Sequence, residues 1–167
     1  GMGGQAAGEV ASLMAVQHIE ERFNSGAFSS TDEKDLEEAL EGLLADVNRA
    51  VLTAGQDSDK RGMGTTCTLV IIKGHQLFYS HVGDSRAYLL RGGELSQITT
   101  DHSWVEEAVA TGTMTREEAR VHPRRNVVTR AIGLDADLKV DTGNVSLQQG
   151  DLILLCSDGL NSMIPDE

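Results

Sequence analysis

The sequence is poor in cysteine and in long apolar runs, and each shortage excludes a class of protein. Its 167 residues include two cysteines, Cys67 and Cys156, both within apolar runs. Two buried thiols make neither a disulfide framework nor a thiolate metal site, so we expect both in the core of a cytoplasmic protein. No apolar run approaches the roughly 20 residues of a membrane span. The chain opens on Gly1-Met2-Gly3-Gly4, which is not the pattern of a signal peptide.

Basic residues are also scarce: 14 stand against 26 acidic residues, and the net charge is -12. Such a charge disfavours nucleic acids and anionic membranes as partners. It is compatible with divalent cations, which relieve the repulsion between clustered carboxylates. At 17.9 kDa and 40% hydrophobic residues, the chain has the size and core content of one domain or most of one.

Spacings typical of several catalytic centres are missing. The five histidines form no His-x-x-x-His pair. Ser157 precedes Asp158, but no base is placed for it, which disfavours a serine nucleophile. We interpret His81, within a strand-like run, as structural. His102 and His122 lie in a polar insert, where a role beside a substrate stays open.

The first third of the chain has helical periodicity. A helix over residues 5–23 carries an apolar stripe of Val10, Leu13, Met14 and Val16 and ends at Asn24-Ser25-Gly26. Ser30 and Glu33 have capping-box spacing for a second helix, which ends at Gly55. Its apolar face consists of Leu36, Leu40, Leu43, Leu44, Val47 and Val51.

Strand-like runs follow, several of them close together in the sequence. Arg91-Gly92-Gly93 reads as a hairpin turn between two of them. This proximity predicts a meander of antiparallel neighbours rather than a parallel sheet. The expected strands are 66–72, 77–82, 87–90, 95–99, 138–145 and 152–156.

Residues 101–133 interrupt the strands with a different pattern. Ser103 with Glu106, and Thr115 with Glu118, have capping-box spacing and predict two short helices. His122-Pro123-Arg124-Arg125 is a polar break after them. A helical insert between strands is typical of a flap over an active site.

Two aspartates stand where apolar strands run into glycine. Asp84 lies in Val82-Gly83-Asp84-Ser85-Arg86, and Asp158 lies in Cys156-Ser157-Asp158-Gly159. A buried carboxylate needs a strong partner, and hard cations take carboxylate oxygens as ligands. The pair therefore predicts a cation site and phosphate chemistry. The alternative is two ordinary turn aspartates, which are common.

Six motifs occur in one order along nearly the whole chain: GMGGQAAGEVAS, GMGTT, VGDSRAYLLRGGELSQIT, DHSWVEEAVATG, EEARVHPRRNVVTRAIG and GDLILLCSDGL. Together they resemble the bacterial form of the metal-dependent serine/threonine protein phosphatases of the 2C type, the PPM family. The resemblance implies an α+β fold, a four-layer αββα sandwich of two antiparallel sheets flanked by helices. It also implies that the insert at about 101–133 is a flap that shapes substrate choice.

The resemblance further implies an activity and a site. Phosphoserine and phosphothreonine in proteins would be hydrolysed by a water activated on Mn²⁺ or Mg²⁺, with two core ions and a third. Asp158 matches a ligand of the core pair and would act in catalysis through the metal-bound water. Gly1 matches a glycine whose backbone carbonyl holds a metal, and Asp84 matches a ligand of the third, weaker ion. The partners would be phosphoproteins, the products of a serine/threonine kinase.

The chain departs from the family pattern at three places. The family's bridging aspartate precedes the position of Gly1, and an Asp-Asn element with a further ligand follows that of Glu167. We therefore expect residues 1–167 to be the central part of a single catalytic domain. Many bacterial members have histidine at the position of Gln5, so a proton-donating role is not carried over. These departures leave an alternative open, a catalytically silent phosphatase-like module that binds or regulates.

Overall fold

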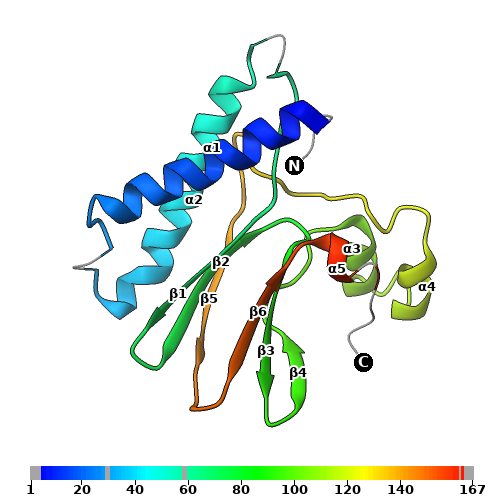
Figure 1. Ribbon diagram of the computed structural model, residues 1–167. Coiled ribbons are helices and arrows are strands. Elements are labelled where there is room, and N and C mark those ends of the chain that lie inside the picture. The colour runs from blue at the N-terminus through cyan, green and yellow to red at the C-terminus, as the bar shows by residue number, and fades with distance from the viewer. Residues whose placement is uncertain (1–4, 29–30, 58–59, 162, 164–167) are drawn as a thin grey trace.

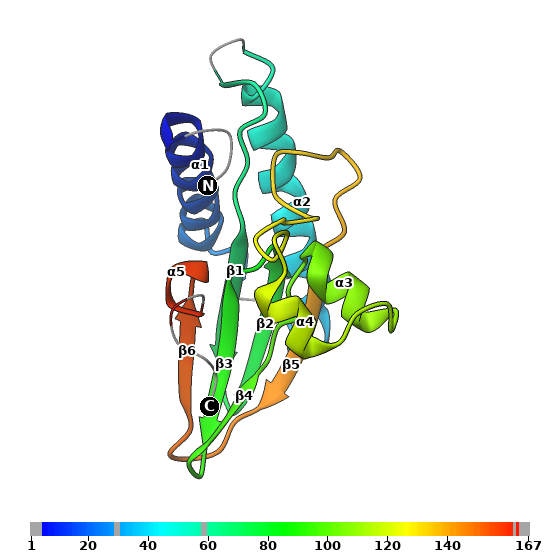
Figure 2. The same ribbon diagram turned by 90° about the vertical axis from the view of Figure 1, so that its right-hand side faces the viewer.

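Two three-stranded antiparallel sheets with flanking helices form the protein, in a computed structural model that describes residues 5–28, 31–57, 60–161 and 163. One sheet has the order β1-β2-β5 and the other the order β4-β3-β6. The two long helices lie on the side of the first sheet, and the short helices lie toward the second (Figures 1 and 2). The α+β class and the antiparallel sheets expected from the sequence are confirmed.

The strands match the expected ones within a few residues, except at one end. Their bounds are β1 Cys67–Lys73, β2 Gln76–Val82, β3 Arg86–Arg91, β4 Glu94–Gln97, β5 Asp141–Ser146 and β6 Leu152–Cys156. The hairpin between β3 and β4 turns through Gly92 and Gly93, both at positive φ, as the sequence predicted. The strand expected from residue 138 begins only at Asp141, where pairing with His81 of β2 starts.

The expected meander is wrong at its centre. β2 and β3 follow one another in sequence but do not pair, because β2 pairs with β5 and β3 pairs with β6. The chain crosses from one sheet to the other through Gly83, Asp84 and Ser85. Each sheet thus combines a local hairpin with a strand from the last third of the chain.

Helix α2, Leu36–Ala54, follows a single 3-10 turn at Glu33–Asp35 and supplies much of the core. All six apolar residues expected on its inner face are buried, so that prediction is confirmed. Ser30, the expected cap, lies outside the described residues. The residue before the 3-10 turn is Asp32, whose side chain makes no capping hydrogen bond.

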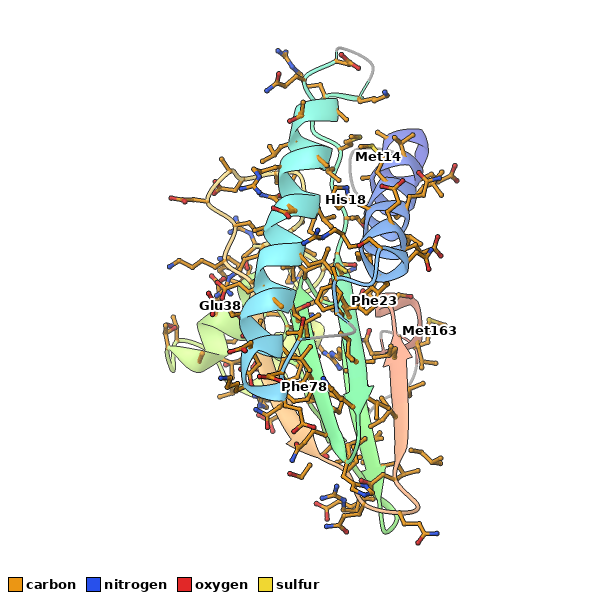
Figure 3. The ribbon with its side chains drawn as sticks, turned by 90° about the vertical axis from the view of Figure 1, so that its left-hand side faces the viewer. Met14, His18, Phe23, Glu38, Phe78 and Met163 are labelled. Carbon is orange, nitrogen blue, oxygen red and sulfur yellow. The ribbon has the colours of Figure 1, made fainter. Side chains whose placement is uncertain are left out.

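Helix α1, Gln5–Asn24, packs on α2 through a different face from the expected one. Ala11 and Ala15 are buried in the core cluster, whereas Leu13 and Val16 are 57% and 52% exposed. The small side chains let the two helix backbones approach closely, so the alanines face α2. Val10 and Met14 flank that contact, and Figure 3 shows Met14 beside α2.

The insert at 101–133, called the flap below, contains the two expected helices. They are α3, Trp104–Ala110, and α4, Arg116–Val121. Ser103 accepts a hydrogen bond from the backbone N–H of Glu106. Thr115 and Glu118 form a complete capping box, which satisfies two free donors at the start of α4.

The sequence predicted that both cysteines lie in the core, and it contained no apolar run long enough for a membrane span. Neither Cys67 nor Cys156, both within the described residues, forms a disulfide. Cys67 packs against the core, and burial raises its pKa to about 11. Cys156 is only half-buried at the end of β6, which is an edge strand in the described part of the chain. None of the described helices is both long and apolar enough to cross a membrane.

Asn48 and Gly133 join α2 to the segment after the flap. Asn48 is 1% exposed; its amide oxygen accepts a hydrogen bond of 2.7 Å from Gly133 N–H. Its amide nitrogen donates to the carbonyl of Asp135, also at 2.7 Å. Gly133 has φ of +90°, and a Cβ there would lie 2.5 Å from Val51 Cγ1 and 2.8 Å from Met63 O. Only glycine fits this junction.

The junction gives a stability prediction with a matched control. Gly133→Ala combines positive-φ strain with a clash against buried atoms, so we expect a loss of about 3 kcal/mol or more in the free energy of unfolding. Gly112→Ala, also at positive φ but in open space, isolates the strain and costs about 1 kcal/mol. Denaturant unfolding of both variants measures the difference; equal losses would contradict the packing at Gly133.

Candidate functional site

Asp84 lies on the crossover between the two sheets, and its neighbours hold that crossover in one shape. Gly83 has φ of +113°, and a Cβ there would overlap the side chain of Thr66. The Thr66 and Ser85 hydroxyls are hydrogen-bonded at 2.9 Å. The GMGTT motif thus ends beneath the Asp84 turn, and Gly83 cannot be replaced without moving it.

Asp158 follows β6, the last strand of the second sheet in chain order. It is the first residue of the four-residue helix α5, Asp158–Asn161. Strand β6 pairs with β3 so that Cys156 lies opposite Arg86. This register brings the residues after β6 next to the residues before β3. The structure therefore brings Asp84 and Asp158 together, as the strand-end pattern predicted.

Both aspartates line one cleft of about 580 Å³ between the second sheet, α5 and the flap. Asp84 is half-buried and Asp158 is exposed. We call these two carboxylates the cleft floor. Burial raises the pKa of Asp84 above its usual value, and the charge of Asp158 raises it further, more than nearby Arg86 lowers it. The floor therefore holds negative charge that the described side chains do not neutralise.

A third carboxylate near the floor already has a partner. Asp101 accepts three hydrogen bonds from Arg86, at 2.7, 2.8 and 3.0 Å. Arg86 also donates to the hydroxyl of Tyr88 at 2.8 Å. A planar, bidentate arginine–carboxylate pair is among the strongest polar contacts in proteins. It ties the first residue of the flap to the start of β3, two residues after Asp84.

His102 holds the base of the flap against the Asp84 turn. It is 3% exposed, and its Nδ1 accepts a hydrogen bond of 3.1 Å from Gly83 N–H. Its own N–H donates to Gly83 O at 2.8 Å, and its carbonyl accepts from Thr129 at the far end of the flap. Because Nδ1 accepts, the ring proton sits on Nε2, which lies 3.0 Å from Asp141 Oδ2.

Asp141, half-buried on β5, completes this network. It also accepts a hydrogen bond of 2.8 Å from Arg130. Burial acts to raise its pKa, but the contacts with His102 and Arg130 outweigh burial and bring the pKa below its usual value. Through its backbone and its ring, His102 thus connects both ends of the flap, the crossover and the first sheet.

His81 is the second buried histidine behind the Asp84 turn, with its ring 4.8 Å from that of His102. Its ring nitrogens lie 2.9 Å from Thr68 Oγ1 and 3.1 Å from the carbonyl of Thr100. Burial, and then the neighbouring His102, lower its pKa to about 4. The geometry agrees with the structural role expected for His81.

Neither flap histidine lines the cleft, so neither supports the role beside a substrate that the sequence left open. His102 is buried behind it, and His122 stacks on Trp104 at 4.9 Å. Ser157 lines a separate, shallow groove with Thr66 and Cys156. Gly1, the third expected metal ligand, lies outside the described residues.

The cleft floor fits a hard cation in donor chemistry, but it is a partial site. Carboxylate oxygens are the ligands that Mg²⁺ and Mn²⁺ prefer, and the unneutralised charge at Asp84 would be relieved by a bound cation. Among the described residues, no cluster of three or more His, Cys, Asp or Glu side chains is arranged to hold a metal ion. The two aspartates would thus be part of a larger ligand set.

Several cleft residues were missed by sequence reasoning. Asn126 and Asn161 line it, and so do three flap arginines: Arg116, Arg120 and Arg125. The signal for the arginines was present in the sequence. They belong to a dense basic run within a chain of net charge -12. The asparagines carry no such signal, because asparagine is common in loops.

Comparison with known proteins identifies relatives for the whole chain. A family model described as Protein phosphatase 2C matches residues 1–167. The serine/threonine phosphatase stp of Listeria monocytogenes is 42% identical over 167 residues, covering 99% of this chain and 66% of that protein. The protein phosphatase PhpP of Streptococcus pneumoniae is 42% identical over 164 residues, with coverages of 98% and 66%. The chain thus spans slightly less than two thirds of the length of these curated relatives.

Solved structures agree in fold. Serine/threonine phosphatase Stp1 from Staphylococcus aureus superposes with a TM-score of 0.91 at 36% identity, over 99% of this chain and 65% of that one. The catalytic domain of the serine/threonine protein phosphatase PstP, in complex with two manganese ions, gives a TM-score of 0.82 at 35% identity, with coverages of 99% and 67%.

Two substitutions at His102 separate the contact of Nδ1 with Gly83 from the contacts of Nε2 with Asp141 and Arg130. In His102→Asn the amide oxygen can replace Nδ1 and accept from Gly83, whereas in His102→Gln the longer amide reaches toward Asp141 and leaves the buried Gly83 N–H unpaired. An unsatisfied buried donor costs about 1–3 kcal/mol, so we expect Gln to be the more destabilising change in denaturant unfolding. Equal losses would mean that ring volume, and not the Gly83 bond, sets the cost.

The lowered pKa of His81 predicts acid sensitivity. The unfolded state, with a pKa of about 6.5, takes up the proton before the folded state, with a pKa of about 4. Stability present above pH 6.5 is therefore lost as the pH falls toward 4. Between pH 7 and pH 5 this group alone removes about 2 kcal/mol. His81→Gln should reduce the measured loss over that range by this amount, while His75→Gln, on an exposed turn, should leave it unchanged.

Proposed function

The chain belongs to the protein phosphatase 2C family, and from this premise we propose that its parent protein hydrolyses phosphoserine and phosphothreonine in proteins. The observation that carries the proposal is the cleft floor, where Asp84 and Asp158 share one cleft with unneutralised negative charge. The relatives are named as phosphatases, which supports an enzyme over the silent module.

The proposed cofactor is Mn²⁺ or Mg²⁺, with Asp158 and the backbone carbonyl of Gly1 in the core site and Asp84 at a third ion. When bound, such ions supply a nucleophilic water near neutral pH and neutralise phosphate charge. The oxygen donors of the cleft floor support this choice over zinc, which favours nitrogen and sulfur ligands. The manganese bound by PstP supports it as well.

Residues in and behind the cleft position these ligands. Gly83 and His102 fix the backbone on which Asp84 sits, because two hydrogen bonds join them. Arg86 pairs with Asp101, which lines the same cleft. Asp158 stands at the start of α5, where the end of β6 fixes its backbone. The floor is thereby pre-organised before any substrate arrives.

The partners follow from the same proposal. Substrates would be phosphoproteins made by a serine/threonine kinase, and the setting would be the cytoplasm. Residues 1–167 would form the central part of one catalytic domain with a flap at about 101–133. The match of one family model to residues 1–167 supports this assignment.

The two aspartates should differ in their contribution to activity. Removing a ligand of the core ions in Asp158→Ala should lower Mn²⁺-dependent turnover of p-nitrophenyl phosphate and a phosphothreonine peptide by more than about 100-fold. Asp84→Ala should lower it by about 10-fold, because its ion is auxiliary. Ser157→Ala serves as the control and should stay within about twofold.

Three outcomes of this experiment, made with the full-length protein, are decisive. Equal losses in the two aspartate variants would contradict the ordering of the sites. A large loss in Ser157→Ala would point to a serine nucleophile instead. Folded wild-type protein that binds Mn²⁺ in calorimetry but turns over neither substrate would remove the proposed activity and leave the silent module.

A further inference from the structure

The turn that carries Asp84 is held by a buried hydrogen bond of the residue before it. Gly83 is buried, and its backbone N–H donates to Nδ1 of His102 at 3.1 Å. A buried N–H that loses its acceptor destabilises the backbone around it. This hydrogen bond exists only while Nδ1 carries no proton, because a protonated Nδ1 would face the N–H of Gly83 as a second donor.

The proton of the neutral His102 ring must therefore lie on Nε2, which contacts two groups of opposite preference. Nε2 lies 3.0 Å from Asp141 Oδ2 and 3.2 Å from Arg130 Nη1. An ionised carboxylate only accepts hydrogen bonds, so Asp141 favours a proton on Nε2. A guanidinium only donates, so Arg130 favours a bare Nε2 and hence a proton on Nδ1. The carboxylate and the guanidinium thus favour opposite tautomers.

The carboxylate of Asp141 resolves this conflict by dividing its two oxygens. Oδ1 accepts a hydrogen bond of 2.8 Å from Arg130, and Oδ2 is the oxygen next to Nε2 of His102. Although burial raises the pKa of Asp141, its contacts with His102 and Arg130 hold the pKa below its usual value, so the group is ionised at neutral pH. One oxygen satisfies the arginine while the other fixes the ring proton.

We propose that Asp141 is a positioning residue for the cation at Asp84. It selects the tautomer of His102 that is protonated on Nε2, and this leaves Nδ1 able to hold the Gly83 N–H and the turn that follows it. The inference rests on the proposed function, of which the cation at Asp84 is a part. It adds to that site a residue of the first sheet that does not line the cleft.

The substitution Asp141→Asn tests the tautomer by changing one atom. The amide of asparagine has one oxygen and one NH₂ group, so it cannot accept from both partners. The charged Arg130 attracts the oxygen, which turns the NH₂ group toward Nε2 of His102. The ring must then accept at Nε2 and carry its proton on Nδ1, where it faces the N–H of Gly83.

Nitrogen NMR of the histidine rings in the metal-free, full-length protein measures the tautomer. The wild type should show the His102 proton on Nε2, and Asp141→Asn should move it to Nδ1. The signal of His102 is the one that disappears in His102→Gln. A His102 ring that keeps its proton on Nε2 in Asp141→Asn overturns the inference.

Calorimetric titration with Mn²⁺ measures the consequence at the cation site. The ion at Asp84 corresponds to the binding step that Asp84→Ala removes. Loss of a residue that orients a metal ligand weakens binding by about 10–100-fold, so we expect Asp141→Asn to raise the dissociation constant of that step by about tenfold. The steps that persist in Asp84→Ala should stay within about twofold, because Asp141 does not act on them.

Removing the arginine should rescue the amide. In Asp141→Asn combined with Arg130→Met, no cation attracts the amide oxygen, which can turn to Nε2 and accept its proton. The double variant should regain Mn²⁺ affinity to within about threefold of the wild type. Arg130→Met alone should change neither the tautomer nor the affinity. Affinity that falls further in the double variant than in Asp141→Asn would mean that lost contacts, and not the tautomer, set the effect.

Asp151 provides the matched control, because it is also an aspartate paired with an arginine. It accepts hydrogen bonds of 2.7 and 2.9 Å from Arg91. It precedes the start of β6, whereas the Asp84 turn lies near the other end of that strand, where Cys156 pairs with Arg86 (Figure 1). Asp151→Asn makes the same chemical change and should leave the His102 tautomer and the Mn²⁺ affinity unchanged.

The outcomes separate this inference from the proposed function. Unchanged affinity in Asp141→Asn, or an equal loss in Asp151→Asn, overturns the inference whatever the protein hydrolyses. A titration in which Asp84→Ala removes no binding step overturns it as well. Protein that shows the expected tautomers and affinities but hydrolyses neither p-nitrophenyl phosphate nor a phosphothreonine peptide supports the positioning role, and only the proposed hydrolysis then fails.

Discussion

The structure depends on how the chain crosses between its two sheets at Gly83. Thr66 leaves no room for a side chain there, and φ of +113° excludes the ordinary backbone conformations of other residues. Two hydrogen bonds with His102 fix the same residue from the other side. The next residue is Asp84. The packing of the sheets, the attachment of the flap and the placement of a candidate ligand are therefore one constraint.

The second organising feature is the charge in the cleft. Burial raises the pKa of Asp84, and the nearby charge of Asp158 raises it further, so the ionised pair is unfavourable without a cation. Arg86 pairs with Asp101. Arg116, Arg120 and Arg125 of the flap line the same cleft as the two aspartates, so side chains of both signs share one space.

The sequence correctly predicted those features that depend on interactions between residues close together in the chain. The inner face of α2, the β3–β4 turn and the Thr115 capping box depend on residues within a few positions of each other, and all were expected correctly. The face of α1 was only partly right: Val10 and Met14 pack against the core, but Leu13 and Val16 are exposed. The partner of α1 is another helix, against which Ala11 and Ala15 allow a closer contact than Leu13 would. The meander was wrong because β5 and β6 are far away in sequence. Asn48 carried no signal, since its partner Gly133 is 85 residues away. For the site, the pair of aspartates could be predicted, but the role of His102 could not.

The contacts that hold the base of the flap are stronger than those that hold its outer part. Its base is held by buried contacts of His102 and by the Arg86–Asp101 pair. Its outer part, α3 and α4, is held by exposed contacts, the Arg116–Glu106 pair and the stack of His122 on Trp104. Exposed ion pairs contribute about 1 kcal/mol or less, whereas breaking buried, satisfied networks costs several. Local opening should therefore begin at the outer part of the flap and leave the crossover intact. The flap helices can then move while the turn that carries Asp84 keeps its geometry.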